Sequence, residues 1–287
     1  MRKLQSHHFQ ASFLLAAILC FFLLPIHYST QAQEVEDERE FDYSEKGEKG
    51  PRRWGELKKE WEACKNGDMQ SPVDVSHVRV NFFRKPAKKA AAYKAANATV
   101  KNRGHDISVE WHGGDAGSFI LNRKRYSLRA AHWHSPSEHT LRGKRYELEM
   151  HALHTSTDPE SGKNSTAVIA VLYKIGKPNS FLSKLMEKIA SMIDQKDQVR
   201  EAGLIDPKEL GFVGAQKYYT YLGSLTTPPC TQGVVWTINK KVKTVSRKQV
   251  KLLREAVHDF AERNARPLQE RNGREIRLLL PSSNANP

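Results

Sequence analysis

The segment His132-Trp133-His134 contains the residues whose type and spacing most clearly suggest metal chemistry. Residues two apart in a β-strand point to the same face and lie about 6–7 Å apart. His132 and His134 can therefore direct two imidazoles at one ion, and imidazole nitrogen is a good ligand for zinc. Pairs with this spacing also occur on ordinary surfaces and in cores, so the pair by itself indicates a metal site without establishing one.

A third ligand has to come from a neighbouring strand, and three histidines are candidates. His151 lies on the next predicted strand, with Glu147 and Glu149 on its own face. His139 and His154 could equally take the third position. Three protein ligands would leave a fourth position for water, which is the pattern of a catalytic rather than a structural zinc.

The elements that would position these residues are mostly strands. Alternating or continuous apolar patterns predict strands at 107–111, 148–153, 167–175 and 234–238. Strands and helices do not alternate regularly, which argues against a doubly wound parallel fold. We therefore expect a mainly β, single-domain protein with a large, mostly antiparallel, twisted central sheet and a few peripheral helices.

Two of these helices can be located from apolar residues at helical spacing. The first is predicted over 180–195. The second is expected to begin near Ser246, because the segment 246–249 fits a capping box. Its expected apolar stripe consists of Val250, Leu253, Val257 and Phe260.

The N-terminal residues 1–32 are expected to be a secretory signal peptide. A basic start precedes an apolar run over 11–24, which is shorter than the roughly 20 residues of a membrane span. Thr30-Gln31-Ala32 is a plausible cleavage site; a buried helix or an uncleaved anchor is the alternative. The folded domain is then expected over 33–280, followed by a flexible tail at 281–287. No membrane association is expected after cleavage.

Cysteine usage and glycosylation motifs agree with export. Cys64 and Cys230 form an even pair outside the signal, and in an oxidising compartment a disulfide between them is the natural expectation. Two separate buried thiols are the alternative. Asn97 and Asn164 each begin an N-glycosylation sequon.

The chain of 287 residues carries a formal net charge of +14. Its basic residues are spread over several runs and are not interleaved with an aromatic nucleic-acid motif, so a solvated basic surface is favoured over nucleic-acid binding. Such a surface could still bind acidic wall polysaccharide weakly.

Several motifs, in order, resemble those of the alpha carbonic anhydrases, in the form found in the plant branch. The matching segments are 132–139, 149–154, 224–229, 70–72 and 264–267, within a resemblance that covers roughly residues 41–280. The resemblance implies the alpha carbonic anhydrase fold and a carbonate dehydratase that reversibly hydrates carbon dioxide to bicarbonate and a proton.

The resemblance also assigns the metal site. It implies that His132, His134 and His151 hold one zinc ion per chain. Zinc lowers the pKa of bound water to about 7, an effect for which carbonic anhydrases are the standard example. The resulting hydroxide would attack carbon dioxide. Glu149 would support His151, and the backbone near Asn264 would support His134.

Substrate and proton-transfer roles follow from the same resemblance. Thr226 would accept the hydrogen bond of the hydroxide and pass its own hydrogen to Glu138, and Thr226 and Thr227 would contact substrate. His105 would be the proton shuttle and Tyr43 would order the shuttle waters. The apolar wall for carbon dioxide would consist of Leu153, Val168, Leu225 and Trp236.

The sequence departs from the family pattern at two positions. The glutamine expected two residues before the first ligand is Ala130, so His132 is expected to lean on a water or a backbone group instead. Arg103 adds charge beside the shuttle. Both positions bear on zinc affinity and turnover.

Two other classes of function remain as alternatives. One is a storage or binding protein on the same fold, and the other is a basic cell-wall protein; the intact ligand set favours the enzyme. No Gly-x-Ser-x-Gly elbow is present, which argues against a serine hydrolase. We expect the secretory pathway and the apoplast, with the chloroplast stroma as the alternative, and either a monomer or a dimer.

Overall fold

The computed structural model describes residues 40–83, 91–114, 116–121, 123–214, 217–257 and 260–281. The expected signal peptide at 1–32 lies outside the described residues and stays a prediction. The described residues all belong to one compact unit, Ala32–Pro287. The last strand ends at Pro281, the first residue of the expected tail, and the rest of that tail is not described.

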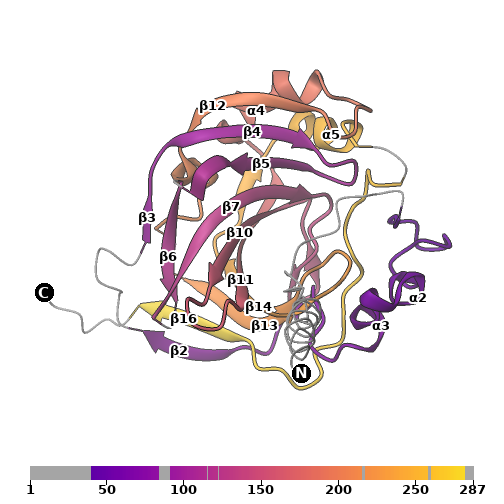
Figure 1. The fold of residues 1–287 in the computed structure, drawn as a ribbon, viewed down its shortest axis with the longest axis vertical. Helices are drawn as coiled ribbons and strands as arrows, with labels where there is room; N and C mark the ends of the chain where they lie inside the picture. The colour runs from indigo at the N-terminus through magenta and orange to yellow at the C-terminus, as the bar shows by residue number, and fades with distance from the viewer. Residues whose placement is uncertain are drawn as a thin grey trace, which may run out of the picture. The chain divides into compact units, whose positions relative to one another are not determined.

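The structure is built around a mixed sheet of thirteen strands (Figure 1). Its main path runs β12-β4-β5-β7-β10-β11-β14-β13-β16-β2, with β3, β6 and β15 paired to strands of this path. A separate three-stranded sheet has the order β1-β8-β9. The strands are β1 Asp74–Val75, β2 Arg79–Phe83, β3 Ala91–Tyr93, β4 Ala96–Asn102, β5 Ile107–Trp111, β6 Gly117–Leu121, β7 Lys124–His134, β8 Thr140–Leu141, β9 Lys144–Arg145, β10 Leu148–Thr157, β11 Asn164–Ile175, β12 Val199–Ile205, β13 Tyr218–Ser224, β14 Gln232–Asn239, β15 Lys243–Val245 and β16 Arg277–Pro281.

The expected sheet is confirmed. Most neighbouring strands of the large sheet are antiparallel, and the parallel pairs are β11 with β14, β11 with β15, and β16 with β2. All four strands predicted from apolar patterns are present. The strand containing His151 and the strand after it are longer than the pattern indicated, because their polar ends pair with each other from Thr155 to Thr157.

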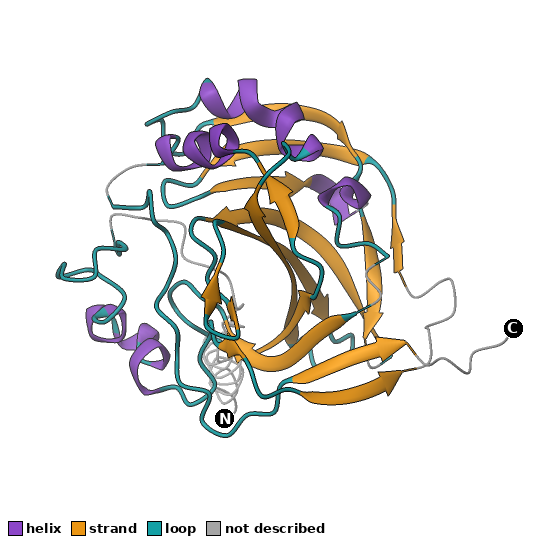
Figure 2. Ribbon diagram, turned by 180° about the vertical axis from the view of Figure 1, so that it is seen from behind, coloured by secondary structure: helices purple, strands orange, loops and turns teal. Residues whose placement is uncertain are grey.

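The helices are short and peripheral. Figure 2 shows them outside the curved sheet, and α4 contacts β4, β12 and α5. They are α2 Trp54–Leu57, η2 Lys59–Trp61, α3 Ala63–Asn66, η3 His112–Gly114, α4 Ser180–Ala190, η4 Pro207–Leu210 and α5 Arg247–Glu255.

Both predicted helices begin where expected but end earlier. The Asn179 side chain caps α4, and Ser246 and Gln249 form the expected capping box of α5. The prediction of helix to residue 195 was wrong, and Phe260 lies beyond α5 with 64% of its surface exposed. Asp194 and Phe260 have positive φ angles, which a right-handed helix does not accommodate.

Alternation along β10 separates the side chains that face the larger core from those that face the candidate site. Met150 and Ala152 join the larger hydrophobic cluster, which also contains Trp133. His151 and Leu153 point to the opposite face, where a second cluster includes Val168 and Trp236. The candidate site therefore lies beside the second cluster.

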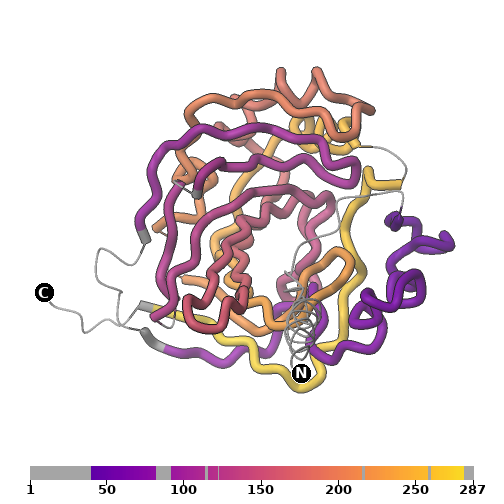
Figure 3. Tube along the Cα trace, viewed as in Figure 1, coloured from indigo at the N-terminus to yellow at the C-terminus, as the bar shows by residue number. Residues whose placement is uncertain are grey.

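The N-terminal and C-terminal parts of the domain lie side by side. In Figure 3 the yellow C-terminal trace runs past the indigo N-terminal segment. The Asn272 amide donates to the Asp68 carbonyl at 2.9 Å, and the Arg266 guanidinium donates to the Cys64 carbonyl at 2.9 Å. The N-terminal segment is packed on the domain from Phe41 onward, because this buried ring packs edge-on against Trp54.

Candidate metal centre

The three histidines of the expected ligand set come together from two adjacent strands. His132 is paired directly with His151 across β7 and β10, and His134 is paired with Glu149. The ring centroids are 4.6–5.2 Å apart, and one ligand atom from each ring lies within 4.8 Å of the others. All three side chains are buried. The strand register thus brings a histidine distant in sequence beside the other two, where it could serve as a third ligand.

Hydrogen bonds to the outer ring nitrogens orient two of these imidazoles. His134 Nδ1 donates to the Asn264 carbonyl at 2.8 Å, which leaves Nε2 for a metal. His151 Nε2 donates to Glu149 Oε1 at 2.9 Å, which leaves Nδ1. Bonds of this kind fix the tautomer and orientation of metal-binding histidines. Glu149 and Asn264 therefore stand where the resemblance implied support for the ligands.

Two buried polar atoms at the centre show that the residues suit a cation. His134 Nε2 and Glu138 Oε2 have no hydrogen-bond partner among the described residues, and they lie 3.7 Å apart. Leaving such atoms unsatisfied in a protein interior costs free energy. A zinc ion would satisfy His134 Nε2, and three imidazoles with an open fourth position are a catalytic zinc set.

The electrostatic environment also favours a bound cation. Burial lowers the pKa of His151, so this imidazole stays neutral and can act as a ligand. Burial alone would lower the pKa of His134, but the carboxylates of Glu138 and Asp106 outweigh it and raise the pKa. The site thus stabilises positive charge at His134, and a metal ion can supply that charge in place of a proton.

His139, one of the open candidates for the third ligand, has another role. Its Nδ1 is 2.7 Å from Glu149 Oε1 and its Nε2 is 2.7 Å from the Tyr221 hydroxyl. Both ring nitrogens are therefore engaged, and His139 holds the carboxylate that in turn supports His151. Glu147, expected on the same face, is exposed and precedes β10.

His154, the other open candidate, is a core residue on the opposite face of β10. Its Nδ1 donates to the Ala152 carbonyl at 2.9 Å, and Nε2 accepts from the Tyr93 hydroxyl at 2.9 Å. The Phe119 ring is 4.8 Å away, edge-on. Burial lowers the pKa of His154 to about 3, so the ring is neutral in the folded protein.

This neutral histidine predicts a specific acid sensitivity. In the unfolded chain His154 has an ordinary pKa near 6.5, so below that pH the unfolded state takes up a proton that the folded state excludes. Stability is therefore retained above pH 6.5 and lost as the pH falls from 6.5 towards 3. We expect the difference in unfolding free energy between wild type and His154→Gln to change by about 1.4 kcal/mol per pH unit between pH 6 and 5.

The measurement is urea unfolding of both proteins from pH 8 to 5. The variant should lose stability less steeply than wild type over this range. Parallel stability curves for the two proteins would show that His154 is protonated as easily in the fold as outside it, contrary to this account.

The expected apolar wall is assembled by strand register. Leu153, Val168 and Trp236 are neighbours across β10, β11 and β14, one row from the histidines. The indole N–H of Trp236 donates to the Ser224 carbonyl at 2.9 Å, and Leu225 is buried in the same cluster. These side chains therefore form a continuous apolar surface beside His151. The ring centroids of His151 and Trp236 are 4.8 Å apart.

The threonines lie next to this wall, in the loop after β13. Thr226 and Thr227 are both buried, and Thr227 Oγ1 has no hydrogen-bond partner among the described residues. The expected hydrogen bond from Thr226 to Glu138 is not formed in this structure. Glu138 Oε1 accepts instead from the backbone N–H of Arg266 at 2.9 Å.

The shuttle candidate His105 lies in the turn before β5. Its ring is 5.3 Å from Phe41, which in turn packs edge-on against Tyr43 at 6.0 Å. Arg103 lies beside the shuttle candidate, as expected, but its charge is balanced there by an acid. Its guanidinium is paired with Asp106, an acid that the sequence reasoning missed although it stands three residues after Arg103.

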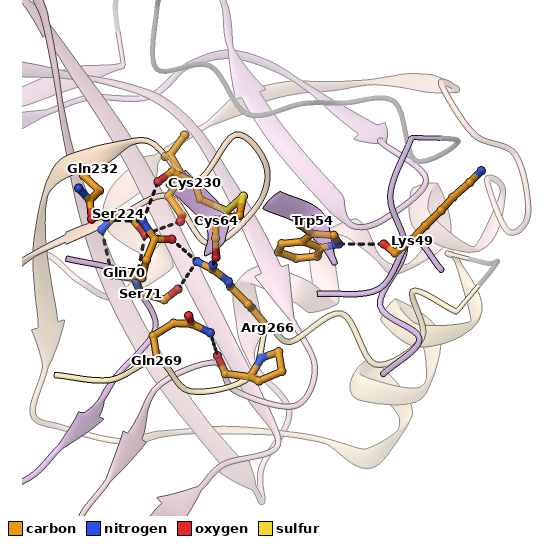
Figure 4. Close-up of a disulfide and its surroundings, with 12 residues drawn as sticks. Lys49, Trp54, Cys64, Gln70, Ser71, Ser224, Cys230, Gln232, Arg266 and Gln269 are labelled. Carbon is orange, nitrogen blue, oxygen red and sulfur yellow. Dashed lines mark hydrogen bonds between the residues drawn. A yellow bond between two sulfur atoms is a disulfide. The ribbon is translucent and has the colours of Figure 1, made fainter. Parts of the chain in front are cut away.

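The disulfide between Cys64 and Cys230 is confirmed, and beside it lies a second residue that sequence reasoning missed (Figure 4). The buried Arg266 donates to Gln70 Oε1 and the Ser71 carbonyl, each at 2.8 Å, besides Cys64. It belongs to the segment 264–267 that contributed to the family resemblance. The Arg266 guanidinium thus links the C-terminal segment 264–267 to the N-terminal segment that contains Cys64, Gln70 and Ser71.

The two sequons lie on strands. Asn97, in β4, is exposed, whereas Asn164, at the start of β11, is half-buried and accepts a hydrogen bond from Thr157 at 2.7 Å. Glycosylation at both stays a prediction. Within the described parts of the chain, no helix combines the length and apolar character needed to cross a membrane.

Comparison with known proteins gives a consistent result. The family model for eukaryotic-type carbonic anhydrase matches residues 49–279. Carbonic anhydrase Nec1 of Nesocodon mauritianus is 53% identical, covering 91% of this chain and 93% of its own length. Alpha carbonic anhydrase 7 of Arabidopsis thaliana is 49% identical, with 86% and 88% covered. A crystal structure of dioscorin complexed with ascorbate matches with a TM-score of 0.78 and 40% identity, covering 85% and 99%.

Proposed function

This chain belongs to the eukaryotic-type, or alpha, carbonic anhydrase family, and from that membership we propose that it is a zinc-dependent enzyme that reversibly hydrates carbon dioxide to bicarbonate and a proton. The observation that carries the proposal is the buried cluster of His132, His134 and His151, with its ring nitrogens within 4.8 Å of one another. A storage protein would have no need of such a cluster or of the bonds that orient it.

The three histidines would hold one zinc ion. Bound zinc would supply a water acidified to a pKa of about 7, and so a nucleophile at neutral pH. The row of Leu153, Val168 and Trp236 would hold carbon dioxide, an uncharged molecule, beside it. We expect Thr226 to orient the nucleophile and Glu138 Oε2 to accept the Thr226 hydrogen. Thr227 Oγ1 is available to an oxygen of the bicarbonate product.

Each turnover releases a proton that has to reach solvent. A histidine suits this transfer because its ordinary pKa is near 6.5. We propose His105 as the carrier. Tyr43, which packs on the same Phe41 ring, would order the intervening waters.

The test is stopped-flow carbon dioxide hydration by the purified mature protein, with zinc measured on the same sample. Fast hydration with about one zinc per chain would support the proposal. Full zinc without hydration would instead favour the second candidate, a protein that binds a small molecule without turnover. The likeness to dioscorin, whose structure was solved with ascorbate, is the reason to keep this candidate. Absence of zinc would count against the three-histidine site itself.

We propose export through the secretory pathway to the apoplast, supported by the apolar N-terminal run and by the disulfide. Light scattering of the mature protein would decide between a monomer and a dimer.

We also propose weak binding of acidic polysaccharide, for which the surface offers a specific location. A hollow of about 560 Å³ is lined by Lys217, Lys240, Lys241 and Lys243. Among the described residues none of these lysines forms an ion pair. Burial and, to a lesser extent, the charge of Lys241 lower the pKa of Lys243, so an acidic polymer bound in the hollow would offset the repulsion between these lysines.

Reversing two of these charges should weaken the binding. We expect Lys240→Glu/Lys241→Glu to bind polygalacturonate about tenfold more weakly at low salt. The control is Lys174→Glu/Lys177→Glu, which makes the same charge change at exposed lysines that do not line the hollow. Equal losses in both variants on a polygalacturonate column would mean that only net charge matters.

A further inference from the structure

A buried ion pair next to the shuttle is not used by the function described so far. Arg103 Nε donates to Asp106 Oδ1 at 2.7 Å, and Nη2 donates to Oδ2. The two side chains are only 7% and 0% exposed. The backbone closes the same turn, since Arg103 N–H donates to the Asp106 carbonyl at 2.9 Å. Arg103 therefore holds the carboxylate in one orientation with both oxygens engaged.

The carboxylate that Arg103 holds faces the shuttle and lies on the metal side of the sheet. His105 Nε2 is 3.6 Å from Asp106 Oδ2. Asp106 directly precedes β5, in which Ser108 pairs with His132, and it lies close enough to His132 for the two groups to interact electrostatically. Burial would raise the pKa of Asp106, but its interactions with Arg103 first, and then with the His105 and His132 rings, hold that pKa well below its usual range.

The turn that carries these residues is pinned to the rest of the site. Asn264 Nδ2 donates to the His105 carbonyl at 2.8 Å, while the Asn264 carbonyl accepts from His134. Asn102 caps the turn by accepting from the N–H of Gly104, whose φ of 86° few other residues would adopt. The His105 backbone is thus fixed relative to His134, and only its side-chain torsions remain to be set.

We propose that Asp106, clamped by Arg103, is a positioning residue that holds the His105 imidazole in one orientation for proton transfer. This inference rests on the proposed function, because it assigns His105 the shuttle role. It explains why two opposite charges are buried together here, a costly arrangement that contributes little net stability by itself. Asp106 attracts the imidazole through Oδ2, while Arg103 prevents the carboxylate from turning away.

The test uses the zinc-loaded full domain and separates proton transfer from the hydration step. Asp106→Asn keeps the shape and removes the charge; Arg103→Gln/Asp106→Asn also removes the arginine that would otherwise be left buried without its partner. We expect kcat for hydration to fall about tenfold in low buffer while kcat/KM stays within about twofold. Added imidazole should restore kcat, since it can carry the proton in place of His105.

A double-mutant cycle with His105→Ala supplies the control. If Asp106 acts through His105, then Asp106→Asn should have no further effect on kcat in the His105→Ala background. Unchanged kcat in the folded double variant would overturn the proposal. A parallel loss of kcat and kcat/KM that imidazole does not restore would overturn it as well, because Asp106 would then support the zinc site or the fold.

A spectroscopic readout keeps this inference separate from the enzyme proposal. The ring resonances of His105 in isotope-labelled protein should report one orientation in wild type and averaging over several in Arg103→Gln/Asp106→Asn. A protein that hydrates no carbon dioxide would defeat the proposed function, while these resonances would still decide whether Asp106 positions His105. Identical resonances in both proteins would reject the positioning role.

Discussion

His134→Ala is expected to abolish carbon dioxide hydration together with zinc binding. His134 is fully buried at the centre of the cluster, and its Nδ1 is held by the Asn264 carbonyl so that Nε2 faces the other two rings. Without this side chain the proposed zinc ion would lose one of its three protein contacts. Zinc lowers the pKa of water from 15.7 to about 7, so its loss removes the nucleophile, and we expect kcat/KM to fall by about 10³-fold or more.

The matched control is His112→Ala, which removes an exposed histidine from η3, outside the cluster. It should retain wild-type zinc content and hydration rate. Zinc content and stopped-flow hydration are measured on each variant after dialysis against a weak chelator. Full activity in His134→Ala with stoichiometric zinc would show that the metal is bound elsewhere.

Removing the disulfide should give the largest loss of stability. Cys64 and Cys230 are 166 residues apart in the sequence, so the bridge restricts the unfolded chain over most of the domain. For Cys64→Ser/Cys230→Ser we expect the free energy of unfolding to fall by about 4–5 kcal/mol in the chain-entropy description. For a domain of this size that corresponds to a decrease in Tm of about 10–20 °C.

The disulfide also contacts residues of the candidate site, so we expect its removal to change the temperature at which activity is lost. The Cys230 N–H donates to the Thr227 carbonyl at 2.9 Å, and the Cys64 carbonyl accepts from Arg266. We expect hydration by the double variant to decline at lower temperature than in wild type, in step with unfolding followed by circular dichroism. Reduced wild type should behave like the variant. An unchanged Tm in the variant and after reduction would contradict this account.

The fold could be predicted from the sequence because the patterns that indicate its strands and helix starts are local. Alternation in 107–111 and 148–153 is a property of single strands, and the capping box at Ser246 needs only four residues. The ends of the helices were not accessible. Asp194 and Phe260 adopt positive φ where the chain turns back onto the domain, and that choice depends on tertiary packing.

The site was accessible only in part, for a similar reason. Spacing brings His132 and His134 to one face, but the choice among His139, His151 and His154 depends on how β10 pairs with β7. That register sets His151 opposite His132, whereas His154, three residues further along β10, points to the other face by strand alternation. Family resemblance supplied the answer that spacing left open.

The buried charged residues around the site were the hardest to predict from the sequence. The two Nη atoms of Arg266 donate to two backbone carbonyls and to Gln70, partners nearly 200 positions away that no local pattern indicates. Arg103 and Asp106 do form a local pattern, opposite charges three residues apart. The same pattern is common on exposed surfaces, so sequence alone gave no reason to place the pair in the interior.

The position of Asn264 near the end of the sequence determines when, during synthesis, the histidine cluster becomes fully supported. Its amide donates to the carbonyls of His105 and Trp133, its Oδ1 accepts from the N–H of Ser135, and its backbone carbonyl holds His134. A ribosome synthesises this residue more than a hundred positions after the ligands. The nascent chain can pair β7 with β10 and place Glu149 beside His151 long before release, yet His134 acquires its hydrogen-bond partner only when the last tenth of the chain has emerged. If the site binds zinc, we expect chains that stop short of Asn264 to retain the ion less well than the complete polypeptide, because His134 then lacks its hydrogen-bond partner.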